Sequence, residues 1–335
     1  MGNFFCRRWM VLIALGILVH SPLLRAGGRQ DAKAKERTPS VLLSSEVKDK
    51  RVRRNERSIA RIEMFDKNFA GTGFWVSRSN SSGKALFLAA EHVVKDSKHV
   101  ALQTKSDTVS FSSRKLLSSE RLDFSLFEIS NVDPDFIRPI RAEKWDKSAN
   151  DLYTLGFPGL NELNVDFMSD EVKKEQGILN EKINDYAKII ADPASTPKNL
   201  LKRRSQLLVS YPPIYSSGTP LPIPLKTRWK LARMTKFQID KTMDTNKLAT
   251  AVSSFAFMAS LVPGASGAPV FSSKTHKTLG MVWAGLQLGD GHVLGFYIPI
   301  QVITRVLWAK SFTLETSDRK WVQTSLAKIY SDSEN

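Results

Sequence analysis

Short apolar runs bounded by turn residues dominate the chain from residue 59 onward. The run at 59–65 alternates weakly, whereas those at 85–90 and 124–129 are almost wholly apolar. Turn formers such as Asn80-Ser81-Ser82-Gly83 separate the runs, which continue at 100–103, 109–111, 251–257, 268–271, 279–286 and 293–298. Many short strands with regular turn signals predict an all-β sandwich or barrel.

The β pattern is interrupted between residues 160 and 250. Residues 169–192 place apolar side chains at an approximately helical spacing, and 199–209 predict a second helix before a proline-rich stretch at 211–224. We therefore expect a basic helical insertion over 160–250, between a β-rich half at 58–159 and a β-rich remainder at 251–312. A helix is expected at 300–310, followed by a polar tail over 313–335.

The first 26 residues have the pattern of an export signal. Arg7 and Arg8 precede an apolar run at 10–19, and Ala26-Gly27-Gly28 offers small residues for cleavage. The run is too short to span a hydrocarbon core of about 30 Å, which favours a cleaved signal peptide over an uncleaved anchor. The sequence therefore predicts an exported protein, located in a bacterial periplasm or outside the cell.

A polar, basic lead-in follows the leader at residues 27–57. Its last third is mostly charged, with no apolar period to organise it. We interpret it as a solvated tail. A cleaved propeptide and an electrostatic tether to an anionic surface are the alternatives.

Charge and composition narrow the classes of function. The 49 basic and 33 acidic side chains give a net charge of +16, which attracts anionic surfaces and nucleic acids without requiring either. The basic residues are not interleaved with aromatic ones in a stripe, so no specific nucleic-acid partner is expected. The single cysteine, Cys6, lies in the leader, which excludes disulfides and cysteine chemistry from the mature chain. No histidine pair stands at ligand spacing beside a carboxylate, and neither a metal nor another cofactor is expected.

Three separated residues combine into a candidate for nucleophilic catalysis. His92 ends an apolar strand, Asp123 opens another, and Ser266 lies in a tight glycine turn between two strands. A serine nucleophile needs a base within hydrogen-bond reach and a third group that orients the base. Each signal alone has a plain alternative, because most single histidines are not catalytic and most Gly-x-Ser-Gly strings are simple turns. The α/β-hydrolase motif Gly-x-Ser-x-Gly is excluded, since its last position is Ala268.

The glycine turn also predicts an oxyanion hole. Gly264 and Gly267 allow the backbone to turn sharply and to direct successive N–H groups toward one point. The N–H groups of Gly264 and Ser266 are the expected donors, each stabilising a negatively charged oxygen by about 3–4 kcal/mol.

Six motifs then occur in the order that trypsin/chymotrypsin-like serine peptidases use. They are Gly71-Thr72-Gly73-Phe74, Ala89-Ala90-x-His92-Val93-Val94, Asp123-Phe124-Ser125-Leu126, Gly156-Phe157-Pro158, Gly264-x-Ser266-Gly267-x-Pro269-Val270 and Gly295-Phe296-Tyr297-Ile298-Pro299. Over 59–159 and 251–309 the chain resembles disulfide-free bacterial members, of the high-temperature-requirement or glutamyl-endopeptidase type. The resemblance implies a chymotrypsin-type double β-barrel with the active site between the barrels. It makes His92 the general base and then acid, Asp123 its orienting group, and Ser266 the nucleophile.

The same alignment places the specificity pocket only loosely. Its base falls near Ser260, and its wall falls at Trp283, Ala284 and Gly285. No acidic side chain stands there, so an apolar or small residue is expected at the cleaved position. A preference for glutamate stays open, because His276 or His292 can bind a carboxylate if either lines the pocket.

Glu91 departs from the family pattern, in which a small residue precedes the histidine. Directed into the cleft, it would act on the imidazole or repel acidic substrates. The expected orientation is outward, as a surface residue.

The sequence therefore predicts an exported serine endopeptidase that hydrolyses peptide bonds of protein or peptide substrates through an acyl-enzyme. The alternative is a catalytically silent binding protein of the same fold that uses the basic helical insertion on a partner. A charge-led binder of nucleic acid or of cell surfaces is the third interpretation. The enzyme is favoured because all three residue types of a catalytic triad occur in these sequence contexts.

Overall fold

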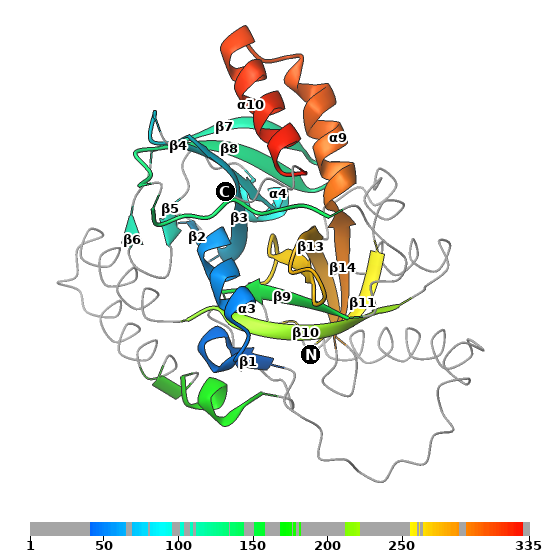
Figure 1. The fold of residues 1–335 in the computed structure, drawn as a ribbon. Coiled ribbons are helices and arrows are strands. Elements are labelled where there is room, and N and C mark those ends of the chain that lie inside the picture. The colour runs from blue at the N-terminus through cyan, green and yellow to red at the C-terminus, as the bar shows by residue number, and fades with distance from the viewer. Residues whose placement is uncertain are drawn as a thin grey trace, which may run out of the picture.

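Two antiparallel sheets form the framework of the protein, which we analysed as a computed structural model (Figure 1). The structure describes residues 41–64, 69–79, 81–95, 101–103, 108–109, 112–133, 135–143, 151–157, 168–175, 177–178, 181, 212–221, 255–259, 261, 264–287 and 293–330. The leader expected at 1–26, residues 27–40 and most of the expected insertion lie outside these ranges. Within them, no helix has the length and apolar character needed to cross a membrane.

The first sheet carries His92 and Asp123 at the ends of its strands. In order of pairing, the strands are β6 (Thr108–Val109), β5 (Ala101–Gln103), β2 (Ile59–Met64), β3 (Phe69–Ser79), β4 (Lys84–Ala89), β8 (Phe124–Ser130) and β7 (Ser112–Ser119). β4 and β8 are buried along nearly their whole length, so both of their faces are covered. This burial explains why their sequences are apolar without alternation.

Two C-terminal helices pack beside this sheet. α9 (Ile300–Ser311) and α10 (Thr316–Lys328) lie side by side (Figure 1). α9 contacts β7 and strands of the second sheet, and α10 contacts β3. α9 confirms the helix expected at 300–310. The polar tail expected over 313–335 is wrong, because Val322, Leu326 and Ile329 form a narrow apolar stripe that docks the otherwise polar α10 on the core. Arg114 of β7 adds a bidentate ion pair to Asp318, at 2.9 and 3.0 Å.

The second sheet closes into a six-stranded barrel. Around it follow β9 (Leu152–Gly156), β10 (Ile214–Leu221), β11 (Phe255–Ala259), β14 (Val293–Pro299), β13 (Thr278–Gln287) and β12 (Pro269–Ser272), which pairs again with β9. A short strand, β1 (Val41–Leu43), adds antiparallel to the first residues of β10. The expectation of a mostly β fold with a β-barrel and a C-terminal helix is confirmed.

Two strands of the barrel correct the expected boundaries between segments. β9 falls inside the first half expected at 58–159, yet its partners are β10 and β12 of the second sheet. β10 falls inside the helical insertion expected at 160–250, in its proline-rich stretch. Only some residues of β10 are buried, so its sequence lacks the apolar run that marks the other strands. Helix is present at 170–175, and most of the remaining insertion lies outside the described residues.

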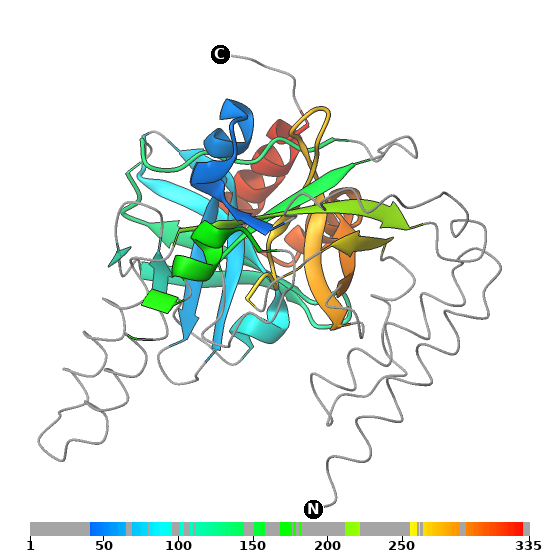
Figure 2. The same ribbon diagram turned by 90° about the horizontal axis from the view of Figure 1, so that it is seen from below.

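Residues 41–58, which we call the N-terminal strap, connect the second sheet to the first (Figure 2). After β1 come η1 (Ser44–Glu46), α3 (Lys50–Asn55) and η2 (Glu56–Ser58), which leads into β2. The solvated tail expected over 27–57 is therefore wrong for residues 41–57. The many charged side chains of α3 are exposed, while Val52 is buried on its inner side, so charge alone misled the interpretation.

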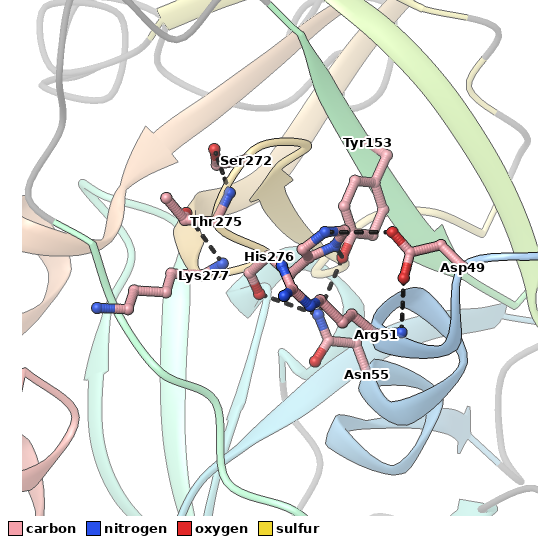
Figure 3. A network of polar contacts seen from close by, with 8 residues as sticks. All are labelled: Asp49, Arg51, Asn55, Tyr153, Ser272, Thr275, His276 and Lys277. Carbon is pink, nitrogen blue, oxygen red and sulfur yellow. Dashed lines mark hydrogen bonds and ion pairs between the residues drawn. The ribbon is translucent and has the colours of Figure 1, made fainter. Parts of the chain in front are cut away.

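A polar network fastens the strap to the second barrel (Figure 3). The Asn55 amide donates to the Tyr153 hydroxyl and to the His276 carbonyl, both at 3.0 Å. His276 Nε2 lies 3.3 Å from the Asp49 carboxylate, and its Nδ1 lies 3.2 Å from the Tyr153 hydroxyl. Burial raises the pKa of Tyr153, so its hydroxyl stays protonated within this network. The network thus joins α3 to the turn between β12 and β13.

Removing the strap is expected to destabilise the protein. A chain that begins at residue 58 lacks the buried side chains of Val41, Leu43 and Val52, each contributing about 1.5–3 kcal/mol. We expect its free energy of unfolding in urea to be lower by more than about 3 kcal/mol than that of a chain beginning at residue 41. Equal unfolding midpoints for the two chains would instead support a removable propeptide.

Candidate active site

His92 and Asp123 form a hydrogen-bonded pair where two buried strands end. His92 lies on the single turn α4 (Glu91–Val94), immediately after β4, and Asp123 directly precedes β8. The distance from His92 Nδ1 to Asp123 Oδ2 is 2.7 Å, and Asp123 Oδ1 accepts the backbone N–H of His92 at 2.9 Å. An ionised carboxylate only accepts hydrogen bonds, so Nδ1 carries the ring proton and Nε2 is left as the basic nitrogen.

Local backbone geometry aims the Asp123 carboxylate at the histidine. Asp123 has φ 54°, in the left-handed region that aspartate tolerates better than most residues. The Asp123 N–H donates a hydrogen bond to the Glu120 carbonyl at 3.3 Å, and the turn that this bond closes holds the conformation of Asp123. The Asp123 carbonyl accepts the Glu91 N–H at 3.1 Å, so main chain and side chain both bind α4. The Asp123 side chain is 2% exposed and that of His92 14%, so water competes little for their bond.

Ser266 sits in a turn that only glycine permits on either side. Gly264 and Gly267 have φ of 94° and 86°, in the left-handed region. The turn is closed by the Ala268 N–H on the Ala265 carbonyl at 2.8 Å, and the Gly267 N–H reaches the Val282 carbonyl at 2.7 Å. Ser266 itself is partly exposed. The turn therefore presents the serine at the surface on a fixed backbone.

Thr72 of β3 ties this turn to the first sheet. Its backbone N–H donates to the Ser266 carbonyl at 2.9 Å, and its hydroxyl donates to the Gly264 carbonyl at 3.0 Å. The same hydroxyl accepts the Phe157 N–H, at the end of β9, at 2.9 Å. Thr72 is fully buried, so each of these bonds forms without competition from water.

Gly71 lies between the serine turn and the histidine helix. A Cβ atom on Gly71 would stand 3.2 Å from the Ser266 carbonyl oxygen and 2.6 Å from Val93 Cγ1 of α4. A Cβ on Gly267 would stand 3.1 Å from the backbone nitrogen of Ala90, two residues before His92. The sequence-predicted residues His92, Asp123 and Ser266 are thus on segments that meet around 71–72 of β3.

The expected pocket residues have different environments. Ser260 and His292 lie outside the described residues. Trp283 is fully buried in the core beside Phe296, and Ala284 is buried with it, whereas Gly285 is exposed on β13. A fully buried Trp283 supports the strand from inside and offers no side-chain surface to a ligand. His276 lies in the strap network, against Asp49 and Tyr153, rather than with Gly285.

Sequence reasoning missed the environment of Glu91. The expected outward orientation is wrong, since Glu91 is 6% exposed and its carboxylate accepts from Lys115 Nζ (3.3 Å) and from the Ser125 hydroxyl. Burial raises the pKa of Glu91, and Lys115 acts against this shift. The sequence around Ser125 and Lys115 gave no sign of a contact with Glu91, because both residues lie far from Glu91 along the chain. Thr72 was visible only as part of a Gly-Thr-Gly string.

No group of three or more His, Cys, Asp or Glu side chains gathers within the described ranges in a way that would hold a metal ion. The site brings together an imidazole, a carboxylate and a hydroxyl, which are groups capable of acid–base and nucleophilic chemistry.

Comparisons with known proteins find similarity only in structure. No protein-family model matches the chain, and no curated protein matches it in sequence. A crystal structure of an inactive form of a serine-to-alanine mutant of Rv3671c from M. tuberculosis H37Rv has 14% sequence identity and a TM-score of 0.43, covering 80% of this chain and 91% of that one. A structure described as the Rv3671c protease, inactive form, has the same identity and TM-score and covers 80% and 94%.

Thr72→Val is expected to destabilise the fold and displace the serine turn. Valine has the shape of threonine but leaves the Gly264 carbonyl and the Phe157 N–H without their buried partner, which costs about 1–3 kcal/mol. Thr72→Ser keeps the hydroxyl and is the matched control. Urea denaturation measures the difference, and equal stability of the valine and serine variants would contradict the assigned bonds.

Gly267→Ala is expected to lower the Tm of the protein more than Gly83→Ala does, although both glycines have positive φ. Alanine at Gly83 meets nothing closer than 3.8 Å, so it costs only the left-handed strain of about 1–2 kcal/mol. Alanine at Gly267 would place Cβ 2.0 Å from the Thr72 carbonyl oxygen, adding about 1–3 kcal/mol of overpacking. Thermal unfolding of the two variants tests this order. A Tm for Gly267→Ala equal to or above that of Gly83→Ala would refute the close approach.

Proposed function

We propose that the protein is a serine endopeptidase that hydrolyses peptide bonds through His92, Asp123 and Ser266. The observation that carries the proposal is the meeting of two segments at 71–72 of β3. The paired histidine stands on α4 at one side, and the serine turn is hydrogen-bonded to Thr72 at the other. A base oriented by a buried carboxylate beside a serine held on a glycine turn is the arrangement that acyl transfer requires.

In the proposed reaction, His92 Nε2 removes the proton from Ser266 Oγ as Oγ attacks the scissile carbonyl carbon. The carbonyl oxygen becomes an oxyanion, which the N–H groups of Gly264 and Ser266 stabilise by about 3–4 kcal/mol each. Asp123 stabilises the imidazolium formed. His92 then gives this proton to the leaving amine as the C–N bond breaks, leaving an acyl-enzyme ester on Ser266. His92 then removes a proton from water as the water oxygen attacks the ester carbonyl carbon. It returns that proton to Ser266 Oγ as the C–Oγ bond breaks, which releases the acid product and restores the serine.

The proposed substrates are proteins or peptides, which would bind beside the exposed Gly285 of β13. Trp283 is buried in the core, and none of the other candidate pocket residues, Ser260, Ala284 and Gly285, is acidic, which favours an apolar or small side chain at the cleaved position. We further propose that the protein is exported, on the pattern of residues 1–26.

Labelling with a fluorophosphonate probe tests the proposed nucleophile and base. The wild-type chain is expected to be labelled on Ser266, as located by mass spectrometry of its peptides. Ser266→Ala is expected to abolish labelling, and His92→Ala to slow it by more than about 10³-fold. Ser273→Ala, on the turn after β12, is the matched control and is expected to label at the wild-type rate.

Absence of labelling in a folded wild-type chain would refute the proposal. It would favour the alternative, a catalytically silent binding protein of the same fold. Equal labelling of His92→Ala and wild type would show that the serine reacts without this base and would also contradict the mechanism.

A further inference from the structure

A buried carboxylate stands beside the proposed catalytic pair without belonging to it. Glu91 immediately precedes His92, and its side chain is enclosed between β7 and β8. Lys115 Nζ of β7 lies 3.3 Å from Oε1 and 3.5 Å from Oε2, and the Ser125 hydroxyl of β8 donates to Oε2. We call Glu91, Lys115 and Ser125 the Glu91 cluster.

The cluster holds both ends of the helix that carries the histidine. Lys115 Nζ also donates to the Val94 carbonyl at 3.3 Å, so one ammonium binds the first and the last residue of α4. Its position is supported by the Phe127 ring, whose centroid lies 5.6 Å away. A helix of one turn is not stable by itself, so contacts of this kind decide where it lies.

The cluster is also coupled to the carboxylate that orients the histidine. Ser125 follows Asp123 by two residues at the start of β8, and the Glu91 N–H donates to the Asp123 carbonyl at 3.1 Å. The charged groups that act on Glu91 are Lys115 from β7, and Asp123 and Glu120 from the turn before β8. Glu91 is thus bonded to β7, to β8 and to the turn that carries Asp123.

Packing alone does not require a charged residue at this position. Burying a carboxylate costs more free energy than burying an apolar side chain of similar size, unless directed hydrogen bonds compensate. Those bonds are present here, and they join α4, which carries His92, to β7 and to the start of β8, two residues after Asp123. The carboxylate therefore contributes directed hydrogen bonds, which a buried apolar side chain of similar size would not provide.

We propose that Glu91 is a positioning residue that holds α4 in place through Lys115 and Ser125 and so fixes the His92 imidazole against Asp123. The inference rests on the proposed function only for its effect on rate, since the geometry of the His92–Asp123 pair can be measured without any reaction.

Glu128 provides a matched control on the same sheet. It is equally buried, at 5%, and its carboxylate binds two cations, Lys84 at 3.2 Å and Arg114 at 3.0 Å. It lies on β8 near the opposite end from Asp123. A general loss of stability from removing a buried ion pair should therefore occur in Glu128→Ala as well as in Glu91→Ala.

The experiment compares Glu91→Ala, Glu91→Gln, Lys115→Met and Glu128→Ala in the full chain. The first readout is the downfield proton resonance of the His92 Nδ1–H, assigned by its loss in Asp123→Ala. The second is the rate of fluorophosphonate labelling of Ser266, and the third is stability in urea.

We expect Glu91→Ala and Lys115→Met to broaden or abolish the resonance and to slow labelling by about tenfold or more. Lys115→Met keeps an apolar stem against Phe127, so it tests the ammonium even if Glu91→Ala folds poorly. Glu91→Gln keeps an acceptor for Ser125 and should label within about threefold of wild type. Because burial raises the pKa of Glu91, the wild-type carboxyl becomes neutral as the pH falls. The labelling rates of wild type and Glu91→Gln should therefore converge at acidic pH. Glu128→Ala should lose stability with its labelling rate and resonance unchanged.

An unchanged resonance and rate in folded Glu91→Ala would overturn the inference, as would an equal slowing in Glu128→Ala. If wild type fails to label but its resonance depends on Glu91, the proposed function fails and the positioning role stands. If wild type is labelled and the resonance is unchanged in Glu91→Ala and Lys115→Met, the proposed function stands and the positioning role fails.

Discussion

Three hydrogen bonds to Thr72 determine where the serine turn lies. They cross from the first sheet to the second, to the Ser266 and Gly264 carbonyls and from the Phe157 N–H. The core that the two sheets share is apolar, and apolar contacts have no preferred direction. Hydrogen bonds made by a fully buried residue do have direction. The bonds of Thr72 therefore fix the position of the serine turn relative to the first sheet, which apolar packing alone does not fix.

Close backbone approach and left-handed dihedrals accompany this position of the serine turn. The serine turn reaches Thr72 only because residues 71 and 267 have no Cβ atom, and Gly264, Gly267 and Asp123 all have positive φ. Glycine adopts positive φ at little cost, whereas the positive φ of Asp123 is strained and persists because surrounding bonds over-determine it. Its carbonyl and both carboxylate oxygens bind α4. The site is therefore a region where strain and hydrogen bonding are balanced against each other.

The sequence predicted those parts of the protein that depend on local pattern. Apolar runs identified β4 and β8, and the glycine turn, His92 and Asp123 were found from their places at strand ends. β10 was missed because its burial is irregular, and α10 because its apolar stripe is only a few residues wide. The ordered strap and the inward orientation of Glu91 were missed for another reason. Charged residues such as Lys50 and Glu91 indicate solvent by default, and only distant partners reveal which of them is buried.

Contacts between remote parts of the chain give the protein an order of assembly. The residues of the first sheet pair mainly with near neighbours in sequence, as in the β2–β3 and β3–β4 ladders. Thr72 and Gly264, by contrast, are 192 residues apart, and Asn55 and His276 are 221 apart. Long-range contacts form slowly because a large loop must close first. A chain that is still being synthesised is therefore expected to pair His92 with Asp123 early, whereas the turn that carries Ser266 reaches Thr72 only when the second barrel closes.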